Sequence, residues 1–102
     1  MGSKHESIVR RLVAKAVRFG ADTLEIEYRD GHQEVAVLKG GVGFGIARFP
    51  SFGVRATSLR KELLSLRKRK ARVAVKGAEY EIRTRLYESF GETAFEVRLR
   101  RI

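Results

Sequence analysis

The sequence predicts an α+β domain with a mostly antiparallel sheet of about five to six strands and two helices that cover one face of it. Three observations favour this fold class. Residues 77–100 alternate apolar and charged side chains with a period of two, which is typical of half-buried strands. Two earlier segments have the apolar spacing of amphipathic helices. The links between successive predicted strands are short, and short links favour antiparallel neighbours.

The first helix is predicted over residues 7–19, where apolar side chains recur at the spacing of a single helix face. Ser7 is a good N-cap, because its hydroxyl can accept a hydrogen bond from an unpaired N–H of the first turn. Gly20 follows the last apolar residue and suits the left-handed conformation that ends many helices. We therefore expect the helix to begin after Ser7 and to end before Gly20.

Three strands are predicted next, over residues 23–28, 33–39 and 42–49. The first strand leads into Asp30-Gly31, a strong hairpin signal because both residues tolerate a positive φ. Gly40-Gly41 permits a second turn, and two further glycines weaken the third strand. This glycine-rich run does not indicate a phosphate-binding loop, since the Lys and the Ser or Thr that hold phosphates and magnesium do not follow it.

A loop is predicted at residues 50–53, followed by a second helix that is capped by Thr57 or Ser58 and continues to about Arg69. Three leucines at helical spacing supply the inner face of this helix. A strand over residues 72–76, with two inward valines, leads into the closing hairpin. The predicted order is therefore helix, three strands, helix, three strands.

The closing hairpin carries one apolar face and one densely charged face. Its charges predict a register that sets acidic side chains opposite basic ones. Three cross-strand pairs result: Glu81 with Arg98, Arg83 with Glu96, and Glu79 with Arg100. Each such pair contributes roughly a few tenths of a kcal/mol and opposes slippage of the strands.

The composition indicates one globular domain spanning residues 1–102, with 43% hydrophobic and 33% charged residues. The chain has no cysteine, so disulfides and thiolate metal sites are excluded. Its two histidines lack paired acids at ligand spacing, and no Ser-His-Asp arrangement can be deduced. We therefore expect no metal, no cofactor and no enzymatic activity. The longest uncharged run, residues 40–47, is too short to cross a bilayer, and we expect a cytoplasmic protein without a transmembrane segment.

The net charge of +10 is concentrated in residues 54–76, which hold nine basic residues and one acid. Six of the basic residues form the candidate polyanion-binding set: Arg60, Lys61, Arg67, Lys68, Arg69 and Lys70. On the predicted helix these charges form two outward rows, one through Arg60 and one through Lys61. The rows can be a solvated helix face, or they can bind nucleic-acid phosphates, anionic lipid or an acidic protein surface.

Aromatic side chains do not interleave with these basic residues, which argues against base stacking. Three aromatic residues are expected on the core faces of the predicted strands: Tyr28, Tyr80 and Phe95. Three others lie in or near loops, where exposure would allow contact with a partner protein: Phe49, Phe52 and Phe90.

Three segments carry a family resemblance. Residues 19–27 read Phe-Gly-Ala-Asp-Thr-Leu-Glu-Ile-Glu and join the first helix to the first strand. Residues 29–31 read Arg-Asp-Gly and lead into residues 34–42. Residues 77–99 form a hairpin whose turn contains Gly-Glu. Together these segments, in this order, resemble the N-terminal, PAS-like domain that precedes the motor domain in type II secretion and type IV pilus assembly ATPases.

The resemblance implies a PAS-like fold and a non-enzymatic interaction or regulatory domain, without the motor domain, that docks on a partner protein. The motor domain of a secretion or pilus ATPase is the partner that it implies. In that family, arginines of this domain reach the nucleotide held by the motor domain, and Arg83 and Arg98 occupy the matching positions. Two alternatives stay open. One is a small basic nucleic-acid-binding protein that uses residues 55–76, and the other is a module that binds an anionic membrane surface through the same charges.

Overall fold

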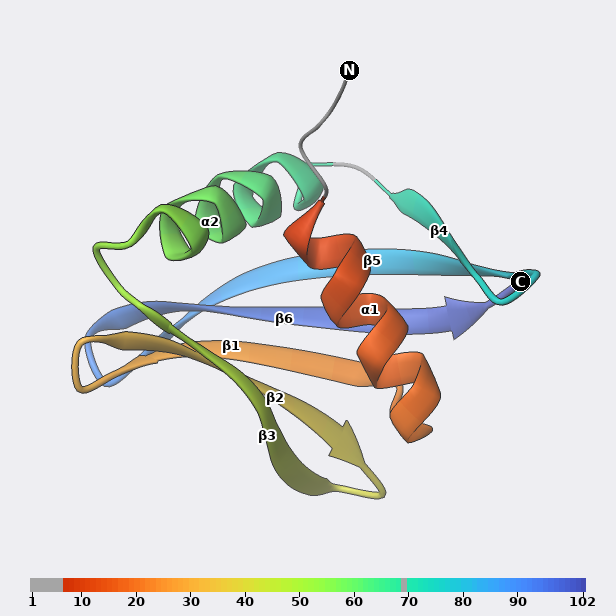
Figure 1. The fold of residues 1–102 in the computed structure, drawn as a ribbon, viewed down its shortest axis with the longest axis horizontal. Coiled ribbons are helices and arrows are strands. Elements are labelled where there is room, and N and C mark those ends of the chain that lie inside the picture. Colours follow the sequence, from red (N-terminus) through yellow and green to blue (C-terminus); the bar gives the residue numbers. More distant parts are fainter. Residues whose placement is uncertain (1–6, 69) are drawn as a thin grey trace.

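The computed structural model describes residues 7–68 and 70–102, which fold into two helices and one six-stranded sheet (Figure 1). The elements are α1 (Ile8–Phe19), β1 (Thr23–Arg29), β2 (His32–Lys39), β3 (Val42–Pro50), α2 (Val54–Leu66), β4 (Ala71–Val75), β5 (Ala78–Ser89) and β6 (Glu92–Arg101). All neighbouring strands are antiparallel, in the order β3-β2-β1-β6-β5-β4. This architecture confirms the predicted α+β class.

The sheet consists of two three-stranded meanders, and each meander follows a helix. They meet at the centre of the sheet, where residues 23–26 of β1 pair with residues 95–98 of β6. The first and last strands are therefore neighbours, and β3 and β4 form the two edges (Figure 1). This junction brings side chains from both meanders onto one surface.

Each of the four hairpins closes through a two-residue turn that has glycine in its second position. The turns are Asp30-Gly31, Gly40-Gly41, Lys76-Gly77 and Phe90-Gly91, and all eight residues have a positive φ. A two-residue turn of this kind matches the twist of the flanking strands, which is why it is favoured in hairpins. The first two turns are confirmed as predicted from the sequence.

The turn at Phe90-Gly91 sets a register in the last hairpin that differs from the predicted one. The observed charged pairs are Glu81 with Arg100, Arg83 with Arg98, and Arg85 with Glu96. Each residue of β5 thus faces a partner two positions further along β6 than expected. The predicted register is wrong because it takes Gly91 out of the turn, where its positive φ is required. Since the shift is even, the apolar and charged faces remain as predicted.

Helix α1 begins and ends as the sequence predicts. The Ser7 side chain accepts a hydrogen bond from the backbone N–H of Arg10 at 3.0 Å. Gly20 has a φ of 84° and its N–H returns to the carbonyls of the last turn. Four residues of one stripe are buried against the sheet: Val9, Leu12, Val13 and Ala16.

Helix α2 begins earlier than predicted, because Gly53 and not Thr57 or Ser58 is its N-cap. The N–H of Gly53 bonds to the carbonyl of Pro50 at 2.9 Å, which turns the chain directly from β3 into the helix. The Thr57 hydroxyl donates back to the carbonyl of Gly53 at 3.0 Å. It therefore lies inside the first turn and does not cap it.

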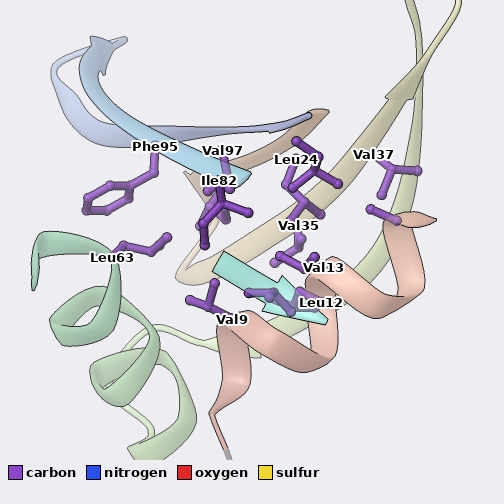
Figure 2. Packing of buried hydrophobic residues seen from close by; sticks show 14 of the residues in the cluster. Val9, Leu12, Val13, Leu24, Val35, Val37, Leu63, Ile82, Phe95 and Val97 are labelled. Atoms are coloured by element: carbon purple, nitrogen blue, oxygen red, sulfur yellow. The ribbon is translucent and has the colours of Figure 1, made fainter. Parts of the chain in front are cut away.

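Both helices pack on the same face of the sheet, and the core lies between the two layers (Figure 2). Figure 2 shows side chains of the helices meeting those of the strands, namely Val9, Leu12, Val13 and Leu63 on one side and Leu24, Val35, Val37, Ile82, Phe95 and Val97 on the other. Phe95 is only 1% exposed and is the largest of the fully buried side chains. The prediction of a single apolar face on the sheet is confirmed.

The aromatic residues follow the prediction with two exceptions, Tyr28 and Phe49, of which Phe49 is a half-buried residue of β3 that packs against the core and not an exposed loop residue. Phe95 is buried, and Tyr80 packs against the edge of the core. Tyr28 is 38% exposed, so its predicted core position is wrong. It lies at the end of β1 beside the hairpin turn, where the strand has passed the core. Phe52 and Phe90, both in turns, have fully exposed side chains.

Candidate functional site

The face of the sheet opposite the helices, here called the open face, carries arginines and glutamates on successive strands. It takes the side chains that alternate with the buried ones of each strand. Carboxylates gather on the first two strands: Glu25, Glu27 and Glu34. Four arginines from β5 and β6 form what we call the arginine cluster: Arg83, Arg85, Arg98 and Arg100. The open face is therefore acidic towards β1 and basic towards β5.

Arg83 and Arg98, the two residues that the family resemblance singles out, lie directly opposite each other on β5 and β6. Their side chains are 65% and 71% exposed. Like charges that face each other across a ladder destabilise it. The repulsion within the pair is reduced by one glutamate beside each arginine, Glu81 beside Arg83 and Glu96 beside Arg98, and an anion bound by both guanidinium groups would reduce it further.

Glu96 lies beside Arg98 of the Arg83–Arg98 pair. Its Oε1 lies 3.3 Å from Nε of Arg98 and 3.3 Å from Nε of Arg85. The two guanidinium groups cover the carboxylate, so the Glu96 side chain is only 13% exposed whereas both arginine side chains are about two-thirds exposed or more. One glutamate therefore serves two arginines.

Glu81 likewise forms ion pairs with the other two arginines of the cluster, Arg83 and Arg100. Its Oε1 accepts a hydrogen bond from Nη2 of Arg100 at 3.1 Å and lies 3.7 Å from Nε of Arg83. Desolvation of the carboxylate opposes its ionisation, but the hydrogen bond and charge of Arg100, with smaller effects of Lys70 and Arg83, hold the pKa of Glu81 below its ordinary value. Four arginines share two carboxylates, which leaves this part of the open face with a charge of +2.

A hollow of about 290 Å³ lies beside Arg83 and Arg98. Arg100, Thr23 and the carboxylates of Asp22 and Glu81 also line it, so three arginines outnumber two acids there, and the Thr23 hydroxyl donates to Oδ1 of Asp22 at 3.0 Å. Guanidinium groups bind carboxylates and phosphates through paired, charge-assisted hydrogen bonds. The hollow is therefore chemically suited to a single carboxylate or phosphate group presented by a partner.

The acidic part of the open face begins at Glu25, which faces Glu96 across the junction of β1 and β6. Burial and the charges of Glu27 and Glu96 raise the pKa of Glu25 above its ordinary value. The Tyr87 hydroxyl donates to Oε2 of Glu27 at 3.1 Å. Burial, together with this hydrogen bond, raises the pKa of Tyr87 to about 12. The Ser89 hydroxyl donates to the same oxygen of Glu27 at 3.4 Å, so this carboxylate accepts hydrogen bonds from two side chains of β5.

The predicted polyanion-binding rows on α2 are shorter than expected. The helix ends at Leu66 and not near Arg69, so Arg67 and Lys68 follow it in a turn and do not extend the rows. Arg69 itself lies outside the described residues. Lys61, Arg67 and Lys68 are exposed. The helix ends early because the chain must turn into β4, which tertiary pairing with β5 requires.

Other basic residues of this segment are engaged within the protein. Nη2 of Arg60 donates to the carbonyl of Ser51 at 3.1 Å and holds the loop before α2, so Arg60 is half-buried and not outward-facing. Arg72 lies 3.6 Å from Glu79 on the neighbouring strand. Lys70 is exposed and lies close enough to the arginine cluster to lower the pKa of a carboxylate there. The basic segment is thus divided between several surfaces.

Other features define what the described part of the chain contains. Gly43 and Gly45 lie within β3 and not in a loop. In residues 7–68 and 70–102, no group of three or more His, Asp or Glu side chains is placed to hold a metal ion. Neither described helix is long and apolar enough to span a membrane.

Comparison with protein-family models and with curated proteins finds no match to the chain.

Two relationships on the open face are not predicted from the sequence. The first is Arg83 opposite Arg98, for which the available signal is Gly91 as the second residue of a two-residue turn. The second is Glu25 opposite Glu96. No local signal reveals it, because it depends on β1 pairing with β6.

Proposed function

We propose that this chain is a non-enzymatic docking module whose arginine cluster binds an acidic group on a partner protein. The observation that carries the proposal is the exposed Arg83–Arg98 pair, which faces like charge with like charge on the open face. An arginine that becomes desolvated at an interface can contribute about 2 kcal/mol or more to binding. A carboxylate or phosphate between the two side chains would gain that contribution and remove the repulsion.

The resemblance to the N-terminal domain of secretion and pilus ATPases suggests the partner. In that family the matching arginines reach a nucleotide held by the motor domain, and the hollow beside Arg83 and Arg98 has room for one phosphate group. We therefore propose a P-loop motor domain of this class as the first partner to test, with the nucleotide phosphate as the anion.

Nucleic-acid binding through residues 55–76 is less well supported by the contacts of this segment. Arg60 is half-buried and donates to the backbone carbonyl of Ser51, so it does not form part of an exposed row of cations. The segment also contains no aromatic residue on which a base could stack.

The test is calorimetric titration of the chain with a nucleotide-loaded motor domain of a secretion ATPase. The double variant Arg83→Gln, Arg98→Gln should weaken binding about tenfold or more. The matched control is Lys61→Gln, Lys68→Gln, which removes the same charge from exposed positions away from the open face. Equal losses in both variants would show that only net charge matters and would contradict docking through the arginine cluster.

A further inference from the structure

A groove runs along α1 between this helix and the edge strand β3. Two hollows of about 320 and 350 Å³ form it, and they are adjacent because Lys15 and Ile46 line both. The helix wall of the groove is a single stripe made of Ile8, Leu12, Lys15 and Phe19. The groove lies beside β3 on the face that the helices cover, whereas the arginine cluster lies on the open face of β5 and β6, so they are separate surfaces.

The groove is not filled by α1, because the residues of α1 that pack on the sheet form a different stripe of the helix from the one that lines the groove. Val13 and Ala16 are completely buried, which leaves the stripe from Ile8 to Phe19 turned towards β3. The strand wall consists of half-buried residues, chiefly Ile46 and Phe49.

Phe19 lines the second hollow and its ring contacts an aromatic ring of β3. Phe19 of α1 and Phe44 of β3 have ring centroids 5.0 Å apart, and their residues are still 39% and 41% exposed. The groove floor is thus apolar along its length and only partly covered.

The free edge of β3 distinguishes this side of the sheet from the other. β3 is nine residues long and pairs only with β2, so one row of its backbone N–H and C=O groups has no strand beside it in the described part of the chain. The opposite edge, β4, has five residues and carries Arg72 on its exposed side. β3 also carries an exposed arginine, Arg48, and its register against β2 shifts between Val35 and Ala36, but it is the longer edge, and a long edge permits pairing with another chain more readily than a short one.

The rim of the groove is entirely basic. Five cationic side chains line the two hollows, namely Arg11, Lys15, Arg18, Arg48 and Arg55, and of these Arg48 is also paired with Glu34 at 3.2 Å. No Asp or Glu among the described residues lines either hollow. A second copy of this chain would bring the same cations to the rim and would be repelled. The apolar residues of the groove make no favourable contact with nucleic-acid phosphates. A peptide that has both apolar and acidic side chains could place the apolar ones in the groove and the acidic ones beside the basic residues around it.

We infer that this groove docks an extended segment of a partner protein, one that alternates apolar with acidic residues and adds as a strand to β3. Backbone hydrogen bonds to the free edge would give affinity, and the groove would select the side chains that point into it. This inference goes beyond the docking proposed for the arginine cluster, because it uses another surface and does not require a motor domain.

The test begins with selection of short random peptides, displayed on phage, against the full chain. We expect the selected peptides to alternate acidic and apolar residues. A synthesised peptide should bind the double variant Lys15→Gln, Arg18→Gln about tenfold more weakly than the wild type. The matched control, Arg10→Gln with Lys61→Gln, removes the same charge from exposed positions outside the groove and should change the affinity less than about twofold.

Hydrogen exchange distinguishes an added strand from other occupants. The β3 amides that do not bond to β2 should exchange more slowly in the peptide complex. The inference would be overturned if no peptide is selected or if the selected peptides are basic. It would also be overturned if the bound peptide is helical and leaves amide exchange in β3 unchanged, or if the double variant and its control lose the same affinity. Displacement of the peptide by a short DNA duplex would assign the groove to nucleic acid instead. None of these measurements depends on the arginine cluster.

Discussion

Glu62 of α2 holds the N-terminus of α1 through Ser7: its carboxylate accepts the Ser7 hydroxyl and, at 3.1 Å, the backbone N–H of Val9. Ser7 is itself the N-cap of that helix. One acidic side chain therefore supports the cap and satisfies a donor of the first turn, where the helix dipole also favours a negative charge. The contact ties together the two helices that cover the core.

Removing this carboxylate should destabilise the fold. Glu62→Ala is expected to lower the free energy of unfolding by about 1–3 kcal/mol, because the half-buried Ser7 and the N–H of Val9 lose their acceptor. Urea denaturation followed by circular dichroism measures the change. Glu92→Ala, which removes an exposed acid at the start of β6, is the control and should have little effect. Equal effects of the two substitutions would show that Glu62 does not stabilise the N-terminus of α1.

The arginines of the open face should differ in their effects on stability. Arg83→Gln removes a repulsion with Arg98 and also a 3.7 Å ion pair with Glu81, and because these effects oppose each other the free energy of unfolding should stay within about 1 kcal/mol of the wild type. Arg85→Gln instead breaks an attraction to Glu96 and should lower it. Denaturant unfolding at low and high salt tests this, since salt should reduce the difference between the two variants. A marked destabilisation by Arg83→Gln alone would contradict the observed register.

Glu25 should make stability fall as the pH rises. Its pKa is raised above 4.5, so the folded state binds this proton more tightly than the unfolded chain does. The resulting stabilisation is complete below pH 4.5 and is lost as the pH rises through the raised value. Glu25→Gln should therefore be more stable than the wild type near neutral pH and should lose this advantage in acid. Thermal melts across the pH range provide the measurement.

Glu81 should show the opposite dependence. Its pKa is lowered, so its stabilising effect is present above pH 4.5 and disappears as the pH falls through the lowered value. Glu81→Gln should be less stable than the wild type near neutral pH, with the difference shrinking in acid. The same melts would refute both assignments if the two variants had parallel pH profiles.

Tyr87 should titrate later than an ordinary phenol. Its pKa of about 12, against an ordinary value of 10.0, follows from burial and from the hydrogen bond to Glu27. Ultraviolet absorbance of tyrosinate in the wild type, minus that of Tyr87→Phe, isolates this group. Glu27→Gln should move the transition towards lower pH, because it removes the charge that opposes deprotonation. A transition that Glu27→Gln leaves unchanged would exclude this cause.

The turn at Phe90-Gly91 gives a prediction for the backbone. Phe90 has a φ of 53° and a fully exposed side chain, so it is held in a conformation that Asn adopts more readily. Phe90→Asn should raise the free energy of unfolding by about 0.5–1 kcal/mol. Gly91→Ala, at a φ of 79°, should lower it by about 1 kcal/mol or more. Loss of stability in both variants would mean that the Phe90 ring contributes contacts.

Local patterns in the sequence determine the elements and their faces. Ser7 and Gly20 mark the ends of α1 because capping is a contact between residues close in the chain. Asp30-Gly31 marks its hairpin for the same reason. The period of two fixes which side chains are buried, and an even error in register leaves these faces unchanged. The class, the two layers and the charged open face follow from these signals alone.

Tertiary structure decides what those patterns leave undetermined. The pairing of β1 with β6, which brings Glu25 opposite Glu96, joins segments far apart in the sequence and depends on how the whole core closes. The early start of α2 at Gly53 depends on the exit of the chain from β3. The open groove beside α1 depends on which strand becomes the edge. Short-range propensities carry no information on the pairing of β1 with β6 or on the groove, because both are set by the packing of distant elements against one another.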